Sequence, residues 1–176
     1  MGDRYELSTL HATVHLGAHA DAPSHYGAGA PTIDQRDPAI YLGPCRVLRV
    51  ASGACEVIGP AVLPDPLGET RILLATGTYP DPEYFRRDFA SVSPDLVERL
   101  ARGGGRLLGV DTPSIDAFAS EDLPAHKACL EHDVSVLEGL WLEGVPEGRY
   151  ELIALPLKLV GFDASPVRAV LRTLDD

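Results

Sequence analysis

The sequence predicts one α/β domain over residues 1–176, built on a mixed, barrel-like β-sheet with few helices. Three observations support this prediction. The chain has 176 residues, a length that suits one compact domain with a sizeable core. Hydrophobic residues make up 45% of it, as in globular proteins. Short apolar or alternating segments outnumber segments with helical periodicity, and no repeat or linker divides the chain.

The expected strands are short segments that are either continuously apolar or alternating. The first is residues 7–19, where the β-branched pair Thr13-Val14 favours an extended backbone. Residues 22–44 are rich in Gly, Pro and Ala, so a long loop is expected there. The other expected strands are 45–50, 71–76, 106–110, 134–142, 150–159 and 167–171.

Two helices are expected. Ser93 is a suitable N-cap, Pro94 fits the first helical turn, and an apolar stripe follows at helical spacing. The glycine run 103–105 is expected to end this helix. The second expected helix is 124–131.

Net charge, hydropathy and cysteine content indicate which partners and which cellular compartment to expect. The formal net charge is −11, which disfavours nucleic acid and anionic membrane surfaces as partners. No apolar stretch is long enough to span a membrane. The three cysteines form no C-x-x-C pair, and together with the polar start of the chain they predict reduced thiols in a cytoplasmic protein.

The segment 15–25 concentrates side chains that bind metals. Gly17 and Pro23 oppose a helix here, so an extended strand is expected, on which residues of one parity share a face. Gly17 shares that parity and would leave room for an ion. Imidazole nitrogen with carboxylate oxygen, without thiolate, is a ligand set for Zn²⁺ or Mn²⁺. Four candidate ligands have this parity: His15, His19, Asp21 and His25.

This run, H-x-G-x-H-x-D-x-P-x-H, resembles the metal-dependent cyclase/formamidase family. Later segments favour its bacterial kynurenine formamidase branch: 41–47, 109–114, 137–140, 150–158 and 163–171. The resemblance extends from about residue 10 to the end of the sequence. It implies the family's swivelling β/β/α type of fold and a homodimer.

The resemblance also implies two divalent ions, Zn²⁺ or Mn²⁺, and assigns their ligands. The five ligands would be His15, His19, Asp21, His126 and Glu138. The first two would bind one ion, the last two would bind the other, and the aspartate would bridge both. His25 matches the position of the catalytic acid/base. Its ordinary pKa of about 6.5 suits both taking and giving a proton.

The implied activity is hydrolysis of a small-molecule substrate, N-formyl-L-kynurenine, to L-kynurenine and formate in tryptophan catabolism. Family members carry a further N-terminal segment that helps to enclose the aromatic substrate, and we expect a shortened form here. Two alternatives therefore remain within the family. One is hydrolysis of another small amide or cyclic imide, as in isatin hydrolase-like relatives. The other is a shortened metal-binding paralogue without turnover.

A serine hydrolase is an alternative from another class, because Ser24 is adjacent to His25. No G-x-S-x-G elbow supports it, and the chain is short for an α/β-hydrolase. Three further polar residues have other expected roles. Spacing alone does not separate His132 from the family-matched histidine, and we expect a supporting or structural role for it. We expect His11 to lie on the surface or in a strand, and Asp111 to form a turn after its strand.

Overall fold

An eight-stranded mixed sheet forms the centre of the structure, a computed structural model that describes residues 5–174. The strand order is β10-β8-β2-β4-β6-β7-β1-β9. The four central strands run parallel to one another: β2 (Leu42–Arg49), β4 (Arg71–Ala75), β6 (Leu107–Val110) and β7 (Ser135–Glu138).

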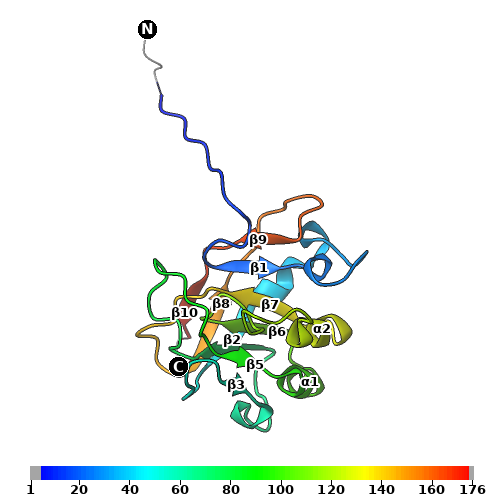
Figure 1. Cartoon of the computed structure of the whole chain (residues 1–176), viewed down its shortest axis with the longest axis vertical. Helices are drawn as coiled ribbons and strands as arrows, with labels where there is room; N and C mark the ends of the chain where they lie inside the picture. The colour runs from blue at the N-terminus through cyan, green and yellow to red at the C-terminus, as the bar shows by residue number, and fades with distance from the viewer. Residues whose placement is uncertain (1–4, 175–176) are drawn as a thin grey trace.

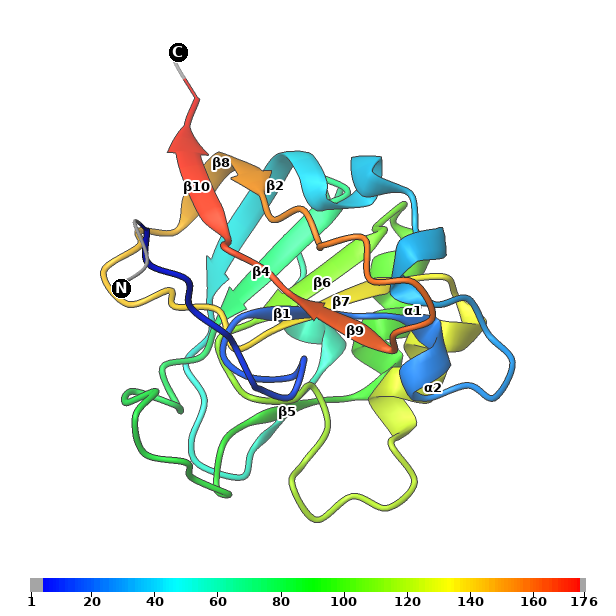
Figure 2. The same cartoon turned by 90° about the horizontal axis from the view of Figure 1, so that it is seen from above.

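Antiparallel strands flank this parallel centre on both sides. On one side β8 (Gly148–Ile153) pairs with β2, and β10 (Val170–Thr173) pairs with β8 at the edge. On the other side β1 (His19–Asp21) pairs with β7, and β9 (Ala164–Pro166) pairs with β1 at the edge. The sheet curls, so that the segment from β9 to β10 crosses its open side (Figure 2). The predicted mixed, barrel-like sheet is therefore confirmed as an open half-barrel. Two short strands, β3 (Val57–Ile58) and β5 (Ser91–Val92), pair separately.

Within residues 5–174, the structure has two α-helices, α1 (Pro94–Arg102) and α2 (Pro124–Glu131), as predicted. They pack against each other on one side of the sheet (Figure 1). The Ser93 hydroxyl caps α1 by accepting a hydrogen bond from the backbone N–H of Leu96 at 3.2 Å. A Cβ at Gly105 would lie 2.5 Å from Cγ of Leu100, because the backbone at Gly105 passes very close to the last turn of the helix. Neither helix is long and apolar enough to cross a membrane.

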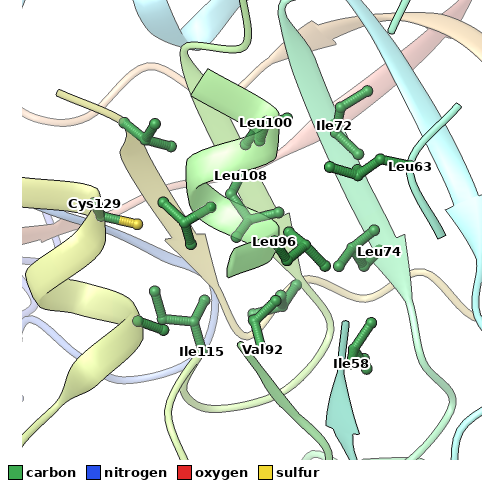
Figure 3. Packing of buried hydrophobic residues seen from close by; sticks show 14 of the residues in the cluster. Ile58, Leu63, Ile72, Leu74, Val92, Leu96, Leu100, Leu108, Ile115 and Cys129 are labelled. Carbon is green, nitrogen blue, oxygen red and sulfur yellow. The ribbon is translucent and has the colours of Figure 1, made fainter. Parts of the chain in front are cut away.

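The core has two parts because side chains alternate along the strands. Ile72 and Leu74 of β4 pack toward the helices, against Leu96 and Leu100 of α1 (Figure 3). Leu73, between them, points into the concave side of the sheet and joins a second buried cluster. Burying each such side chain contributes about 1.5–3 kcal/mol to folding. The half-barrel is thus packed on its helical side, while its concave side also borders a cavity.

The expected strand over residues 7–19 is wrong. Residues 6–13 form no regular element and lead away from the body (Figure 1), with Leu10 86% exposed. Residues 14–18 turn and bend, and Gly17 has a left-handed φ of +67°. No neighbouring strand within residues 5–174 pairs with this segment, so its β-branched residues have no ladder to join.

Other boundaries also differ from the prediction. The expected loop 22–44 contains three short 3-10 helices: Pro23–His25, Ile33–Gln35 and Pro38–Tyr41. A fourth, Pro60–Val62, precedes β4. The expected strand 134–142 stops at Glu138, because Gly139 takes a left-handed φ of +64°. The expected strand 167–171 is found as β10, shifted to start at Val170, and β9, which was not predicted, forms the opposite edge of the sheet.

Candidate metal centre

Two adjacent strands supply the centre of the candidate site. His19 of β1 is paired across the ladder with Glu138, the last residue of β7. The His19 Nε2 atom lies 3.4 Å from Oε2 of Glu138 and 3.4 Å from Oδ1 of Asp21. Two residues apart on an extended strand, His19 and Asp21 share a face, as the parity argument predicted for this pair.

The parity argument was wrong for His15, Gly17 and His25, which do not lie on an extended strand. His15 lies in the turn before β1, and His25 lies in the 3-10 helix after it. Gly17 forms the turn rather than a space for an ion. Its carbonyl accepts a hydrogen bond from Nδ1–H of His19 at 2.8 Å, which leaves Nε2 of that imidazole facing the carboxylates.

His15 completes one group of donor atoms. Its Nδ1 lies 3.2 Å from Oδ1 of Asp21, the same oxygen that faces His19. These three residues place one ligand atom each within 4.8 Å of one another, close enough to hold a metal ion. The folded turn therefore brings together ligands that an extended strand would have spread along its length.

Helix α2 supplies a second group through His126, as the resemblance implied. Its Nε2 lies 3.3 Å from Oδ2 of Asp21 and 3.2 Å from Oε1 of Glu138. Asp116 orients this imidazole by accepting a hydrogen bond from its Nδ1–H at 2.7 Å. The same carboxylate accepts the backbone N–H groups of Ala125 and His126 at 3.0 Å each, so it also caps α2.

The donor set fits a bound cation. Asp21, His19, His126 and Glu138 are each no more than 3% exposed. Nε2 of His19 and Oδ1 of Asp21 are buried, and neither has a hydrogen-bond partner among residues 5–174. Buried polar atoms normally have a partner, because losing water without one is costly. A divalent ion would satisfy both atoms, and imidazole with carboxylate is a suitable ligand set.

The charges in the centre favour bound positive charge. Burial lowers the pKa of His126, but its contacts with Asp116, Asp21 and Glu138 outweigh this and raise the pKa to about 11. Burial likewise lowers the pKa of His15, and contacts with carboxylates raise it to about 9. The pKa of Asp21 is lowered despite burial, because imidazoles contact both of its oxygens.

His25 lies beside this centre. Its ring centroid is 4.2 Å from that of His15 and 6.2 Å from that of His126. Its Nδ1 contacts Oδ2 of Asp163 at 3.1 Å. The neighbouring Ser24 hydroxyl makes no hydrogen bond to any residue that the structure describes. The structure therefore lacks the serine–histidine contact that the serine hydrolase alternative needs within residues 5–174.

His132 and His11 lie on the surface, and Asp111 borders the same cavity as His15 and His19. His132 is exposed and ends α2, where its backbone N–H bonds to the carbonyl of Ala128. His11 is exposed in the N-terminal segment. The Asp111 carboxylate accepts hydrogen bonds from the Thr76 hydroxyl at 2.6 Å and from the backbone N–H of Gly77 at 2.8 Å. These contacts agree with the turn-forming role expected for Asp111.

Sequence reasoning missed two carboxylates of the site. Asp116 precedes its imidazole partner by ten residues, but the contact depends on the loop that joins β6 to α2. Asp163 lies 138 residues from His25 along the chain. No local spacing signals either contact, although Asp163 begins one of the segments that carry the family resemblance.

A cavity of about 810 Å³ adjoins the centre on the concave side of the sheet. His15 and His19 form part of its wall, and most of the remaining lining is apolar. Leu140, Trp141 and Leu152 are among its lining residues. The volume lies in the range of small-molecule sites, which are commonly apolar with a few placed polar groups.

Solved structures with this fold define the class of protein. A protein described as a potential metal-dependent hydrolase with cyclase activity superposes with a TM-score of 0.80 and 34% identity. The match covers 90% of this chain and 78% of that one. Isatin hydrolase A from Labrenzia aggregata has the same fold, with a TM-score of 0.75 and 24% identity over 89% of this chain and 72% of that one. The fold is that of cyclase-type metal-dependent hydrolases.

Sequence comparison identifies the family. The family model described as "Putative cyclase" matches residues 4–117. The kynurenine formamidase of Maricaulis maris (strain MCS10) is 46% identical over 175 residues, which covers 96% of this chain and 81% of that protein. The chain belongs to the cyclase family, and within it is similar to kynurenine formamidases.

Proposed function

We propose that this chain is an arylformamidase that hydrolyses N-formyl-L-kynurenine to L-kynurenine and formate. The observation that carries the proposal is the buried Asp21 carboxylate, whose two oxygens face different imidazoles beside an apolar cavity. Identity of 46% to a kynurenine formamidase supports the choice of substrate over a cyclic imide. The isatin hydrolase likeness, at 24% identity, supports the fold alone.

We propose two divalent ions, Zn²⁺ or Mn²⁺, because two of the three groups of donor atoms that could hold a metal share the buried Asp21. One group is His15, His19 and Asp21, and the other is Asp21, His126 and Glu138. In each group a different oxygen of Asp21 takes part. When bound, such ions lower the pKa of water to about 7 and polarise a carbonyl oxygen.

The residues around the centre would divide the remaining work. His25 would take a proton from the attacking water and give it to the amine nitrogen as the C–N bond breaks, so that the aryl amine leaves neutral. The second water proton leaves with formic acid, which ionises to formate. The apolar wall near Trp141 and Leu140 would hold the aryl ring and keep bulk water from the reacting carbonyl.

A formate-release assay tests this proposal. The purified protein is stripped with a chelator, reloaded with Zn²⁺ or Mn²⁺, and given N-formyl-L-kynurenine or isatin. We expect formate from the first substrate, loss of activity on stripping and recovery on reloading. Faster hydrolysis of isatin would favour the cyclic-imide alternative. A fully metallated protein that turns over neither substrate would contradict the proposal and favour the non-catalytic alternative.

We also propose a homodimer. The connection from β8 to β9 exposes four large apolar side chains: Leu155, Leu157, Val160 and Phe162, each at least 47% exposed. Apolar side chains gathered on one exposed segment are typical of protein interfaces. Light scattering at micromolar concentration tests this, and a monomer mass would contradict it.

We propose the cytoplasm as the place of action, because the three cysteines form no disulfide and a reducing compartment keeps thiols in that state.

A further inference from the structure

The Asp163 carboxylate makes two contacts that the mechanism above does not use. Its Oδ2 atom lies 3.1 Å from Nδ1 of His25 and 3.0 Å from Nε2 of His15. A single carboxylate oxygen is therefore shared by a candidate metal ligand and the candidate acid/base. An ionised carboxylate only accepts hydrogen bonds, so both of these imidazole nitrogens carry the hydrogen.

The backbone holds Asp163 in this position from both sides. The register of β9 with β1 pairs Ala164 with Asp21, and the Asp163 carbonyl accepts the N–H of Ala22 at 2.8 Å. On the other side, the N–H of Gly161 donates to Asp34 at 3.0 Å. The side chain is 46% exposed, but its backbone is anchored to the segment that carries His25.

We propose that Asp163 is a positioning residue for His25. By accepting the Nδ1–H of His25, it selects the tautomer in which Nε2 is free to exchange a proton with water and with the leaving amine. This inference rests on the proposed function, because it takes His25 as the acid/base. Through its other contact, Asp163 accepts the Nε2–H of His15, so Nδ1, which faces Asp21, would be the nitrogen that loses its proton when a metal binds.

The tautomer of His25 decides whether its Nε2 can accept a proton from water. In the selected form, Nε2 accepts a proton from water and His25 becomes a cation beside the carboxylate, which stabilises it. The same proton then moves to the amine nitrogen as the C–N bond breaks, and the starting tautomer returns. The opposite tautomer would present a hydrogen to the water and could not accept a proton at that atom.

Kinetics of Asp163→Ala and Asp163→Asn with N-formyl-L-kynurenine at saturating Zn²⁺ test the inference. We expect Asp163→Ala to lower kcat about 10–100-fold, the usual range for such supporting groups, with little change in KM. Asp163→Asn keeps an acceptor oxygen and should recover part of the loss. Asp34→Ala is the matched control, because it releases the same loop at Gly161 without touching either imidazole. An equal loss in the control would overturn the inference.

A double-mutant cycle separates the two contacts of Asp163. If it acts through His25, adding Asp163→Ala to His25→Ala should reduce kcat little further at saturating Zn²⁺. Losses that multiply would mean that it acts through His15 and would overturn the inference.

Nitrogen-15 NMR of the zinc-loaded protein reads the tautomer without reference to activity. We expect the Nδ1–H form of His25 in the unmutated protein and its loss in Asp163→Ala. An active enzyme whose His25 carries its hydrogen on Nε2 would overturn the inference. An inert protein that shows the Nδ1–H form would overturn the proposed function, yet support the control of this tautomer by Asp163.

Discussion

The Nε2 atom of His126 lies 3.3 Å from Oδ2 of Asp21, although 105 residues separate them along the chain. The other oxygen, Oδ1, faces His15 and His19. One buried carboxylate thus joins a helix from the second half of the chain to the turn and strand near its start. Loss of His15, His19 or His126 should therefore weaken metal binding. Loss of His25 should not, because within the described residues its imidazole contacts Asp163 rather than either oxygen of Asp21.

The first prediction compares His19→Ala with His25→Ala. His19 is buried, and its Nε2 has no hydrogen-bond partner in the part of the chain that the structure describes, so its loss should remove both metal and activity. His25→Ala should keep its metal content and lose about 10²–10⁴-fold in kcat, the usual worth of general acid–base catalysis. Elemental analysis and formate release under identical loading measure both effects. Loss of metal from His25→Ala would instead make His25 a ligand, in the group it forms with His15 and Asp163.

The second prediction concerns Asp116, which both caps α2 and orients His126. Asp116→Ala should weaken the metal affinity of the group containing His126 about 10–100-fold. It should also destabilise the metal-free protein by about 1 kcal/mol through the lost cap. Competition with a chromophoric chelator and thermal unfolding measure these effects.

Asp122→Ala provides the control for that experiment. Asp122 lies near the start of the same helix, but its side chain is 95% exposed, and its Oδ1 lies 3.9 Å from Nζ of Lys127 rather than beside His126. It should leave both metal affinity and thermal stability unchanged. Equal effects of the two substitutions would show that the charge near the helix, rather than the contact with His126, matters.

Local sequence chemistry predicted the elements whose stabilising contacts are themselves local. Helix α1 follows from Ser93, Pro94 and the glycine run, because cap and stripe lie within a few turns. The N-terminal strand was wrong because a strand needs a partner, and residues 7–13 have none among the described residues. Propensity at Thr13 and Val14 could not supply that information.

The residues of the candidate site also differ in whether local sequence could predict them. The four clustered positions from His15 to His25 were visible in the sequence, and they do converge, although by a turn and a 3-10 helix rather than along one strand face. His126 and Glu138 came only from the resemblance. Asp116 and Asp163 could not be predicted, because their positions depend on loop paths and on the pairing of β9 with β1.

The third prediction uses two glycines with left-handed backbones. A Cβ at Gly139 would lie 2.4 Å from the carbonyl oxygen of Gly17, which holds the His19 imidazole. A Cβ at Gly144 would meet nothing within 4 Å, although its φ is +72°. Both alanine variants should lose about 1–2 kcal/mol from the left-handed backbone. Gly139→Ala should lose about 1–3 kcal/mol more from the clash, and should also bind metal more weakly.

Urea unfolding of the metal-free proteins, together with metal titration, measures this difference. The backbone carbonyl of Gly17 cannot move away without disturbing its hydrogen bond to His19. Equal stability and equal metal affinity of the two variants would mean that the approach of β7 to this turn is looser than the structure describes.

The fourth prediction is proton release on metal binding. In the metal-free protein the pKa of His15 is raised to about 9 and that of His126 to about 11, so both imidazoles are protonated at neutral pH. A metal binds the neutral imidazole, so these two residues should release about two protons when the centre fills. Metal affinity should therefore rise with pH, and the rise should weaken above about 9, where His15 is already neutral in the metal-free protein.

Calorimetric titration with Zn²⁺ in buffers of different ionisation enthalpy counts these protons. Asp116→Asn is the informative variant, because Asp116 is the main carboxylate contact that raises the pKa of His126 against the lowering effect of burial. Without that charge, His126 loses its proton at lower pH in the metal-free protein, and fewer protons remain to be released at alkaline pH. Heats that do not depend on the buffer would show that neutral imidazoles already face Asp21 before the metal binds, and would contradict the charge distribution described for this centre.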